Sequence, residues 1–193
     1  MERNSQVEQG FILESQIREA YGKVVYSQTC QDKKYHSLIQ MNDRVKMAQI
    51  VLSALTTGGF IAAVALDEMI AGIVGALFST MLLILNAYMK NFEPIAKADK
   101  HKEASDILWK IKEEYVSLLT DFETLSQDDI KSKRDNLQAR VHEVYTKYPK
   151  TDLKSYLEAQ KALKTEEEQT FSEQEIDVML PNSIRRNNRH IDS

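Results

Sequence analysis

The sequence predicts an all-α membrane protein: a two-helix transmembrane hairpin with flanking cytoplasmic amphipathic helices that form a small helical bundle. Two uncharged apolar runs, residues 47–66 and 69–89, are separated only by Asp67 and Glu68. Each run has about the 20 residues that a helix needs to cross a hydrocarbon core. The remainder is strongly charged, places apolar residues at helical spacing, and contains few helix breakers, with 6 Gly and 3 Pro in the whole chain.

A hairpin is favoured over one long helix because of length and charge. A single helix through both runs would be about 65 Å long, roughly twice the thickness of the core. It would also hold Asp67 and Glu68 near the middle of the bilayer, where each carboxylate costs roughly 3 kcal/mol. A turn at 67–68 places both carboxylates in water. The alternative is a hairpin buried in a soluble helical domain, which is disfavoured because uncharged runs of this length are rare in soluble cores.

Lysine and arginine residues flank both outer ends of the hairpin and are absent from its turn. Positively charged flanks stay on the cytoplasmic side of a membrane. We therefore expect a multi-pass protein of the inner (cytoplasmic) membrane, with both termini in the cytoplasm and the turn outside. The flanking residues are Lys33, Lys34, Arg44 and Lys46 before the hairpin, and Lys90, Lys97, Lys100 and Lys102 after it.

Residues 1–46 are predicted to form N-terminal cytoplasmic amphipathic helices. Apolar residues recur every three to four positions over about 11–29, and a second, more polar helix is expected over 32–44, which either ends before the first span or runs straight into it. Gly22 lies inside the first of these helices at a cost of about 1 kcal/mol relative to Ala. We therefore expect Gly22 to mark close packing against another helix.

Residues 90–181 are predicted to form a C-terminal cytoplasmic helical region. Pro94 breaks the helical pattern after the second span, because a proline cannot donate within a helix. Ser126, Asp152 and Ser172 are expected to cap the N-termini of later helices, and Ser172 begins a Ser-Glu-Gln-Glu capping box.

The cytoplasmic helices are too polar to be stable alone. Each carries one apolar stripe, so they should pack as a bundle, against each other or between subunits. Residues 182–193 form a polar tail with three arginines, and their composition predicts disorder.

The chain carries no motif for catalysis, a cofactor or a metal. It contains no GxGxxG, GxxxxGK[ST] or HExxH sequence, and its one cysteine, Cys30, allows no internal disulfide. The histidines are scattered, and His101 and His142 are expected on solvated helix faces. A net charge of −4 argues against nucleic-acid binding. We therefore expect no enzymatic activity, no cofactor and no nucleic-acid partner.

Polar and small residues within the spans are the candidate functional positions. They either line a water path or pack helices together, with hydroxyls bonded back to their own helix. Two helices cannot enclose a channel, so a pore requires a homo-oligomer. Asn86 is the best candidate for lining, because its amide is costly when it faces lipid. The candidates are Ser53, Thr56, Thr57, Gly75, Ser79 and Asn86.

Several short stretches carry a family resemblance. They are GKVVYSQTCQDK (22–33), QIVLSALTTGGF (49–60), LNAYMKNF (85–92), LWKIKEEYVSLLTDF (108–122), KRDNLQ (133–138) and parts of 161–186. Together they resemble the SLATT family, the two-transmembrane effectors associated with prokaryotic nucleotide-signalling (SMODS and SLOG) systems. The sequence Ser-Gln-Thr-Cys-Gln at 27–31 departs from the Thr-His-Lys-Thr-His that we expect in many members.

The resemblance implies a membrane effector of an antiphage defence system. In such systems a partner senses infection or makes a nucleotide signal, and the effector then oligomerises or opens in the inner membrane and harms the cell. The implied partners are the lipid bilayer, further copies of the chain, and a sensor or nucleotide-synthesising protein. The alternative is a non-enzymatic membrane anchor or scaffold that presents the cytoplasmic bundle to a partner protein.

Overall fold

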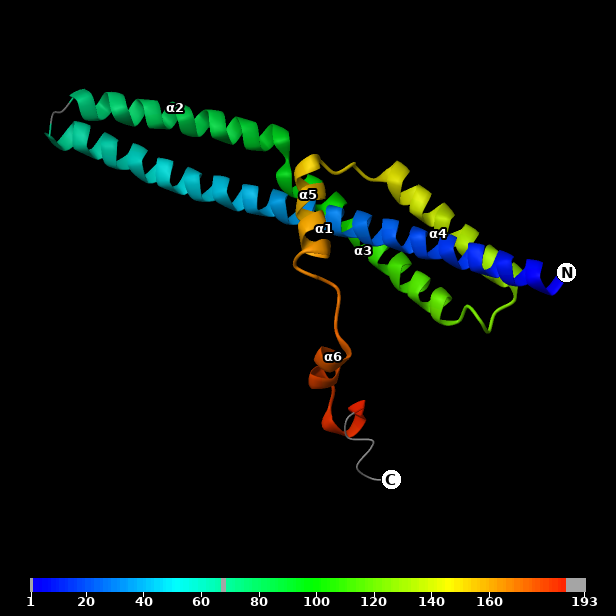
Figure 1. Cartoon of the computed structure of the whole chain (residues 1–193). Helices are drawn as coiled ribbons and strands as arrows, with labels where there is room; N and C mark the ends of the chain where they lie inside the picture. Colours follow the sequence, from blue (N-terminus) through cyan, green and yellow to red (C-terminus); the bar gives the residue numbers. More distant parts are fainter. Residues whose placement is uncertain (1, 67–68, 187–193) are drawn as a thin grey trace.

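The computed structural model describes residues 2–66 and 69–186, and every element of regular structure within these ranges is a helix. The predicted all-α class is therefore confirmed. Figure 1 shows a long molecule in which a two-helix hairpin extends from one end of a helical bundle. The turn predicted at Asp67 and Glu68 lies outside the described residues.

The first helix, α1 (Glu2–Leu66), runs through both the bundle and the hairpin. Its 65 residues span about 97 Å at the usual helical rise. The structure thus lacks the break expected between the helices at 11–29 and 32–44, and the second of them runs straight into the first span. No Gly or Pro lies between Gly22 and Gly58, and at the expected break the Thr29 hydroxyl donates to the Val25 carbonyl at 2.9 Å. This part of the chain therefore contains no signal that would end the helix.

The second helix, α2 (Met69–Phe92), lies antiparallel to the second half of α1 and completes the hairpin (Figure 1). It ends at Glu93, which has a left-handed backbone with φ 49° and ψ 57°. Pro94 is the first residue of α3 (Pro94–Thr120), a position where the missing N–H has no helical partner to lose. The break expected at Pro94 is therefore confirmed, and α3 packs along the first half of α1.

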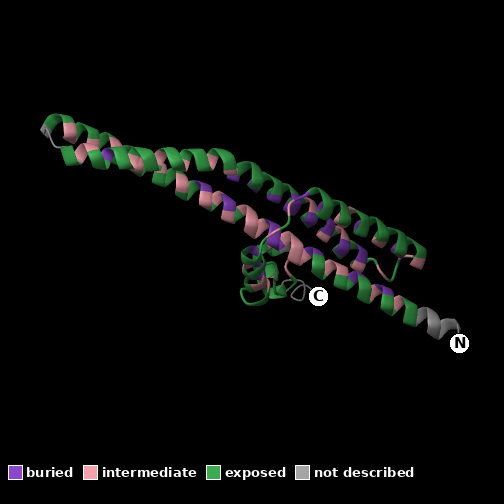
Figure 2. Ribbon diagram, turned by 90° about the horizontal axis from the view of Figure 1, so that it is seen from above, coloured by how far each residue is buried: buried purple, intermediate pink, exposed green. Residues whose placement is uncertain are grey.

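The core of the bundle lies between α1, α3 and α4 (Gln127–Lys147). Figure 2 shows that buried positions concentrate in the bundle, whereas the hairpin is mostly exposed. The apolar stripes of the bundle helices meet in this core. Its buried members are Leu13, Ile17, Val24, Ala104, Leu108, Ile111, Tyr115, Leu118, Ile130, Leu137, Val144 and Tyr148.

Two sequence-based expectations about the bundle are wrong. Gly22 is exposed, and a Cβ atom placed on it would have no neighbour within 4 Å, so it marks no helix contact. His101 is only 4% exposed, because this face of α3 packs on α1 and brings Gln31 Oε1 to 2.5 Å from its Nδ1. His142 is exposed, as expected.

The three predicted N-caps are confirmed. The side chains of Ser126, at the start of α4, and Asp152, at the start of α5 (Leu153–Lys164), each accept a hydrogen bond from the backbone N–H three residues later. Ser172 forms the predicted capping box at the start of α6 (Glu173–Met179). These local signals fix where the later helices begin.

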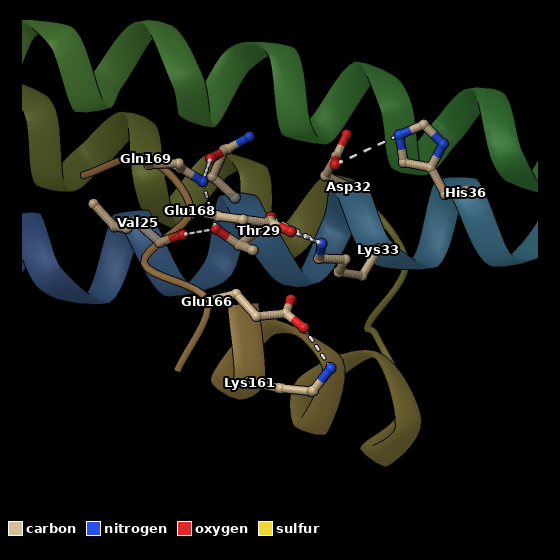
Figure 3. A network of polar contacts seen from close by, with 10 residues as sticks. Val25, Thr29, Asp32, Lys33, His36, Lys161, Glu166, Glu168 and Gln169 are labelled. Carbon is tan, nitrogen blue, oxygen red and sulfur yellow. Dashed lines mark hydrogen bonds and ion pairs between the residues drawn. The ribbon is translucent and has the colours of Figure 1, made fainter. Parts of the chain in front are cut away.

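Side-chain contacts tie the segment after α5 to α1 (Figure 3). Lys33 donates to both carboxylate oxygens of Glu168 at 2.9 Å, and Gln169 Nε2 donates to the Thr29 hydroxyl at 2.9 Å. Beyond this attachment α6 stands away from the bundle (Figure 1) and has no buried residue.

The first part of the tail differs from the disorder that its composition predicts. Asn182–Ile184 forms a 3-10 turn. Arg185 donates to the carbonyls of Leu180 and Val178 at 2.9 and 2.8 Å, so the chain folds back on the end of α6. Residues 187–193 lie outside the described residues.

Two helices of the described chain are long and apolar enough to cross a membrane. Only 0% and 6% of their most apolar windows are buried within the molecule. A core helix of a soluble domain would be mostly buried, so the exposure of both helices disfavours the soluble-hairpin alternative. The exposed apolar surface supports contact with a lipid bilayer.

Candidate functional site: the polar edge of the hairpin

Helices α1 and α2 pack through a seam of residues spaced alternately by three and four positions. These positions are shielded, whereas most of their neighbours are exposed. The spacing is that of helices packing side by side with a seven-residue repeat. The seam residues are Val45, Gln49, Leu52, Thr56, Gly59 and Ala63 in α1, and Ala71, Gly75, Phe78, Leu82, Leu85 and Met89 in α2.

The two helices approach closely at Gly59 and Gly75. A Cβ atom placed on Gly59 would lie 3.2 Å from Gly75 Cα and 3.3 Å from the Ala71 carbonyl oxygen. Gly75 itself is buried. Small residues permit such close approach of membrane helices, which is driven by van der Waals packing. Gly75 therefore lies in the contact between α1 and α2.

One side of the seam carries polar side chains, and we call it the polar edge. Gln49 Nε2 donates to Asn86 Oδ1 at 2.7 Å, which joins the two helices there. An open groove beside this pair is lined by further polar residues of α1 and also by the apolar Ile50, Ala54 and Leu82. Ser79 lies two turns before Asn86 and is exposed, so it continues the edge along α2. The polar edge consists of Lys46, Gln49, Ser53, Thr57, Ser79 and Asn86.

The opposite side of the seam, the apolar edge, carries only apolar or aromatic side chains. Leu55 of α1 and Val74, Met81 and Tyr88 of α2 recur there at the corresponding repeat positions. They are between 42% and 59% exposed, so no other part of the described chain covers them. The hairpin therefore has two chemically different edges.

The six candidate residues fall into two groups. Ser53, Thr57, Ser79 and Asn86 are exposed on the polar edge, whereas Thr56 and Gly75 lie in the seam. The Thr56 and Thr57 hydroxyls donate to carbonyls four residues earlier in α1, at 2.8 and 3.0 Å. These two hydroxyl donors are therefore satisfied within their own helix.

Gln49 and Lys46 complete the edge and are not among the residues predicted from the sequence. One feature of the sequence could have identified Gln49: it lies one turn before Ser53, on the same side of the helix. Its pairing with Asn86 depends on the register between α1 and α2, which the sequence does not show.

The site holds amides, hydroxyls and one lysine at its end. Such groups can bind water or another helix, but none is a nucleophile or a base held by a second group. Within residues 2–66 and 69–186, no group of three or more His, Cys, Asp or Glu side chains could hold a metal ion.

The family resemblance is confirmed by comparison with known families. The model described as SMODS and SLOG-associating 2TM effector domain family 4 matches residues 13–175. The match covers most of the bundle, the whole hairpin and the start of α6. No curated protein and no solved structure matches the chain. The chain belongs to the SMODS and SLOG-associating 2TM effector domain family 4.

Proposed function

We propose that the chain is a membrane effector of a prokaryotic antiphage defence system, and that several copies assemble in the inner membrane into a pore with their polar edges inward. The contrast between the polar and the apolar edge of the hairpin carries this proposal. The description of the family as an effector domain with two transmembrane helices supports it.

The two amides of the polar edge favour an assembly over a single hairpin in lipid. The hydrogen bond between Gln49 and Asn86 satisfies one N–H of the Gln49 amide and one acceptor site of the Asn86 carbonyl. The other carbonyl and N–H groups of these two amides need further partners. In hydrocarbon an unsatisfied polar group costs several kcal/mol. Neighbouring copies or a water-filled interior supply those partners when polar edges face inward, and lipid then covers the apolar edge.

The polar groups occupy different depths in such an assembly. Both termini are cytoplasmic in the proposed orientation, so Gln49 and Asn86 lie near the cytoplasmic surface. Thr57 and Ser79 lie deeper in the spans. A pore built this way has a ring of amides at its cytoplasmic mouth and hydroxyls further in.

The bundle is the part that receives a signal in this proposal. The family's association with SMODS and SLOG proteins supports a partner that senses infection or makes a nucleotide. Helix α1 passes from the bundle into the hairpin without a break. A displacement of its first half is therefore transmitted to the polar edge.

Leakage of reconstituted liposomes tests the pore. Asn86→Leu is expected to reduce the leak seen with the unchanged protein, because it removes the amide from the polar edge. The matched control is Met81→Leu, which changes a residue of the apolar edge in the same helix and should leave the leak unchanged. Equal leaks for both variants would exclude Asn86 from the lining, and no leak even with the natural partner triggered would exclude the pore.

The anchor function has one observation in its favour. Helix α6 and its flanks expose Phe171, Val178 and Met179 by 61–68%, away from the bundle, which suits contact with a partner. Replacing residues 47–89 by an unrelated neutral hairpin separates the two functions. An anchor keeps its activity after the exchange, and a pore loses it.

A further inference from the structure

A second site lies in the bundle, about where α1, the end of α4 and the start of α5 meet. It is a cavity of about 490 Å³, which falls within the size range of small-molecule sites. Four of the chain's 8 tyrosines line it: Tyr26, Tyr145, Tyr148 and Tyr156. Lys150 is at its wall as well. Such a concentration of aromatic rings in one cavity is typical of sites that bind planar molecules.

Contacts between distant parts of the chain hold the walls in place. The Ser27 and Tyr145 hydroxyls are 2.6 Å apart and hydrogen-bonded. The Tyr26 and Tyr156 rings are stacked, with centroids 6.0 Å apart and planes inclined by 30°. The aromatic surfaces are therefore positioned before any ligand arrives, which lowers the entropy cost of binding.

Gln31 of α1 joins three parts of the chain at the base of the cavity, through hydrogen bonds to Pro149 and to His101 of α3. Its Nε2 donates to the Pro149 carbonyl at 3.2 Å, so its Oε1 is the acceptor toward His101 Nδ1 at 2.5 Å. His101 is consequently the Nδ1–H tautomer.

The charges at the cavity favour an anion. Lys150 forms no ion pair with any residue in the part of the chain that the structure describes. Asp152, close to it in sequence, is paired with Lys34 at 2.8 Å, so its negative charge is offset. The Glu103 carboxylate lies near the Tyr148 hydroxyl and has Lys147 close by to offset its charge. An acidic group of a ligand therefore meets the available ammonium group of Lys150, and the carboxylates nearby each have a lysine beside them.

We propose that this cavity binds a small molecule with a planar aromatic ring and an acidic group, of the class of a nucleoside monophosphate. The ring stacks on Tyr156 and Tyr145, which are 45% and 47% exposed, and the acidic group pairs with Lys150. The inference goes beyond the proposed function, because it gives this chain a ligand of its own and does not depend on a pore. The wall of the cavity on α1 ends at Gln31, about 24 Å along the same helix from the start of the first span at Met47.

Calorimetric titration of the full chain in nanodiscs tests the site. The probes are adenosine 5′-monophosphate, adenosine, phenyl phosphate and ribose 5-phosphate. The monophosphate is expected to bind more tightly than adenosine, which lacks the acidic group, and than ribose 5-phosphate, which lacks the ring. Phenyl phosphate tests whether the site needs a nucleotide or accepts any aromatic anion. If phenyl phosphate binds as tightly as the monophosphate, the ligand class is aromatic anions in general. If it binds more weakly, the ligand class is nucleotides.

Two pairs of variants locate the binding. Tyr156→Ala is expected to weaken binding of the monophosphate about 5- to 150-fold, the range of one lost stacking contact. Its matched control is Leu157→Ala, at a neighbouring exposed position outside the cavity, which should leave affinity unchanged. Lys150→Gln should abolish the preference for the monophosphate over adenosine, and Lys154→Gln should preserve it.

The rate of chemical modification of the single cysteine, Cys30, gives a second measure of ligand binding that needs no variant. Cys30 lies on the cavity wall, 7% exposed, and burial raises the pKa of its thiol. Modification by iodoacetamide is therefore slow, and saturating monophosphate should slow it further. The proposal is overturned if no probe binds at millimolar concentration, if Tyr156→Ala changes affinity less than twofold, or if ribose 5-phosphate binds as well as the monophosphate.

Discussion

The close approach of α1 and α2 predicts opposite effects for two neighbouring glycines. Replacing Gly by Ala within a helix gains about 1 kcal/mol of intrinsic propensity. A Cβ atom on Gly58 meets no atom within 4 Å, so Gly58→Ala keeps this gain. On Gly59 the same atom would lie 3.2 and 3.3 Å from backbone atoms of Gly75 and Ala71, which cannot rotate away.

The expected magnitude follows from overpacking. Inserting a methyl group into such a contact costs about 1–3 kcal/mol. Both variants gain the same helix propensity. The free energy of hairpin packing should therefore be less favourable in Gly59→Ala than in Gly58→Ala by this amount, which lowers the equilibrium constant for packing about 5- to 150-fold. Gly75→Ala should fall between them, since its Cβ would meet backbone atoms at 3.6 Å, an ordinary contact distance.

A disulfide across the seam measures this packing. Gln49→Cys and Asn86→Cys, introduced together with Cys30→Ser, replace a pair of side chains that touch at 2.7 Å. The ratio of oxidised to reduced protein in a glutathione buffer gives the effective concentration of the two thiols, which rises with the population of packed hairpin. Equal ratios in Gly58→Ala and Gly59→Ala, or a higher ratio in Gly59→Ala, would refute the assignment of Gly59 to a tight contact.

Three further predictions concern the bundle, whose unfolding can be followed through the fluorescence of its single tryptophan. Burial and Lys34 lower the pKa of His101 below its ordinary 6.5, against the opposing effect of Asp152. The unfolded chain then binds a proton that the folded chain does not, so stability should fall as the pH drops below about 6.5, and His101→Gln should flatten this dependence. An unchanged pH profile in that variant contradicts the burial of the imidazole. Gly22→Ala should stabilise the bundle by about 0.5–1 kcal/mol, because its Cβ meets nothing within 4 Å; a loss of stability would show that the glycine has a packing role. Tyr26→Phe should leave stability unchanged or raise it by up to about 1 kcal/mol, since the Tyr26 hydroxyl is buried without a hydrogen-bond partner among the described residues. A marked loss in that variant would reveal a partner.

The sequence by itself determined the all-α class, the two spans, the break at Pro94 and the three N-caps. These features depend on composition, on periodicity or on side chains within a few residues of the backbone that they affect. A run of 20 apolar residues is readable wherever it occurs, and a Ser at an N-cap bonds a backbone N–H only three residues away. The family resemblance likewise rests on short local stretches and is confirmed over residues 13–175.

Only the tertiary structure decided which helix faces meet. Adjacent residues Thr56 and Thr57 look equivalent in the sequence, yet the register between α1 and α2 places one in the seam and the other on the polar edge. His101 is buried because α3 packs it against Gln31, 70 residues away. The tyrosine cavity joins side chains as far apart as Tyr26 and Tyr156. Long-range pairing depends on the rotation and register of whole helices, and helical periodicity alone leaves both of these open.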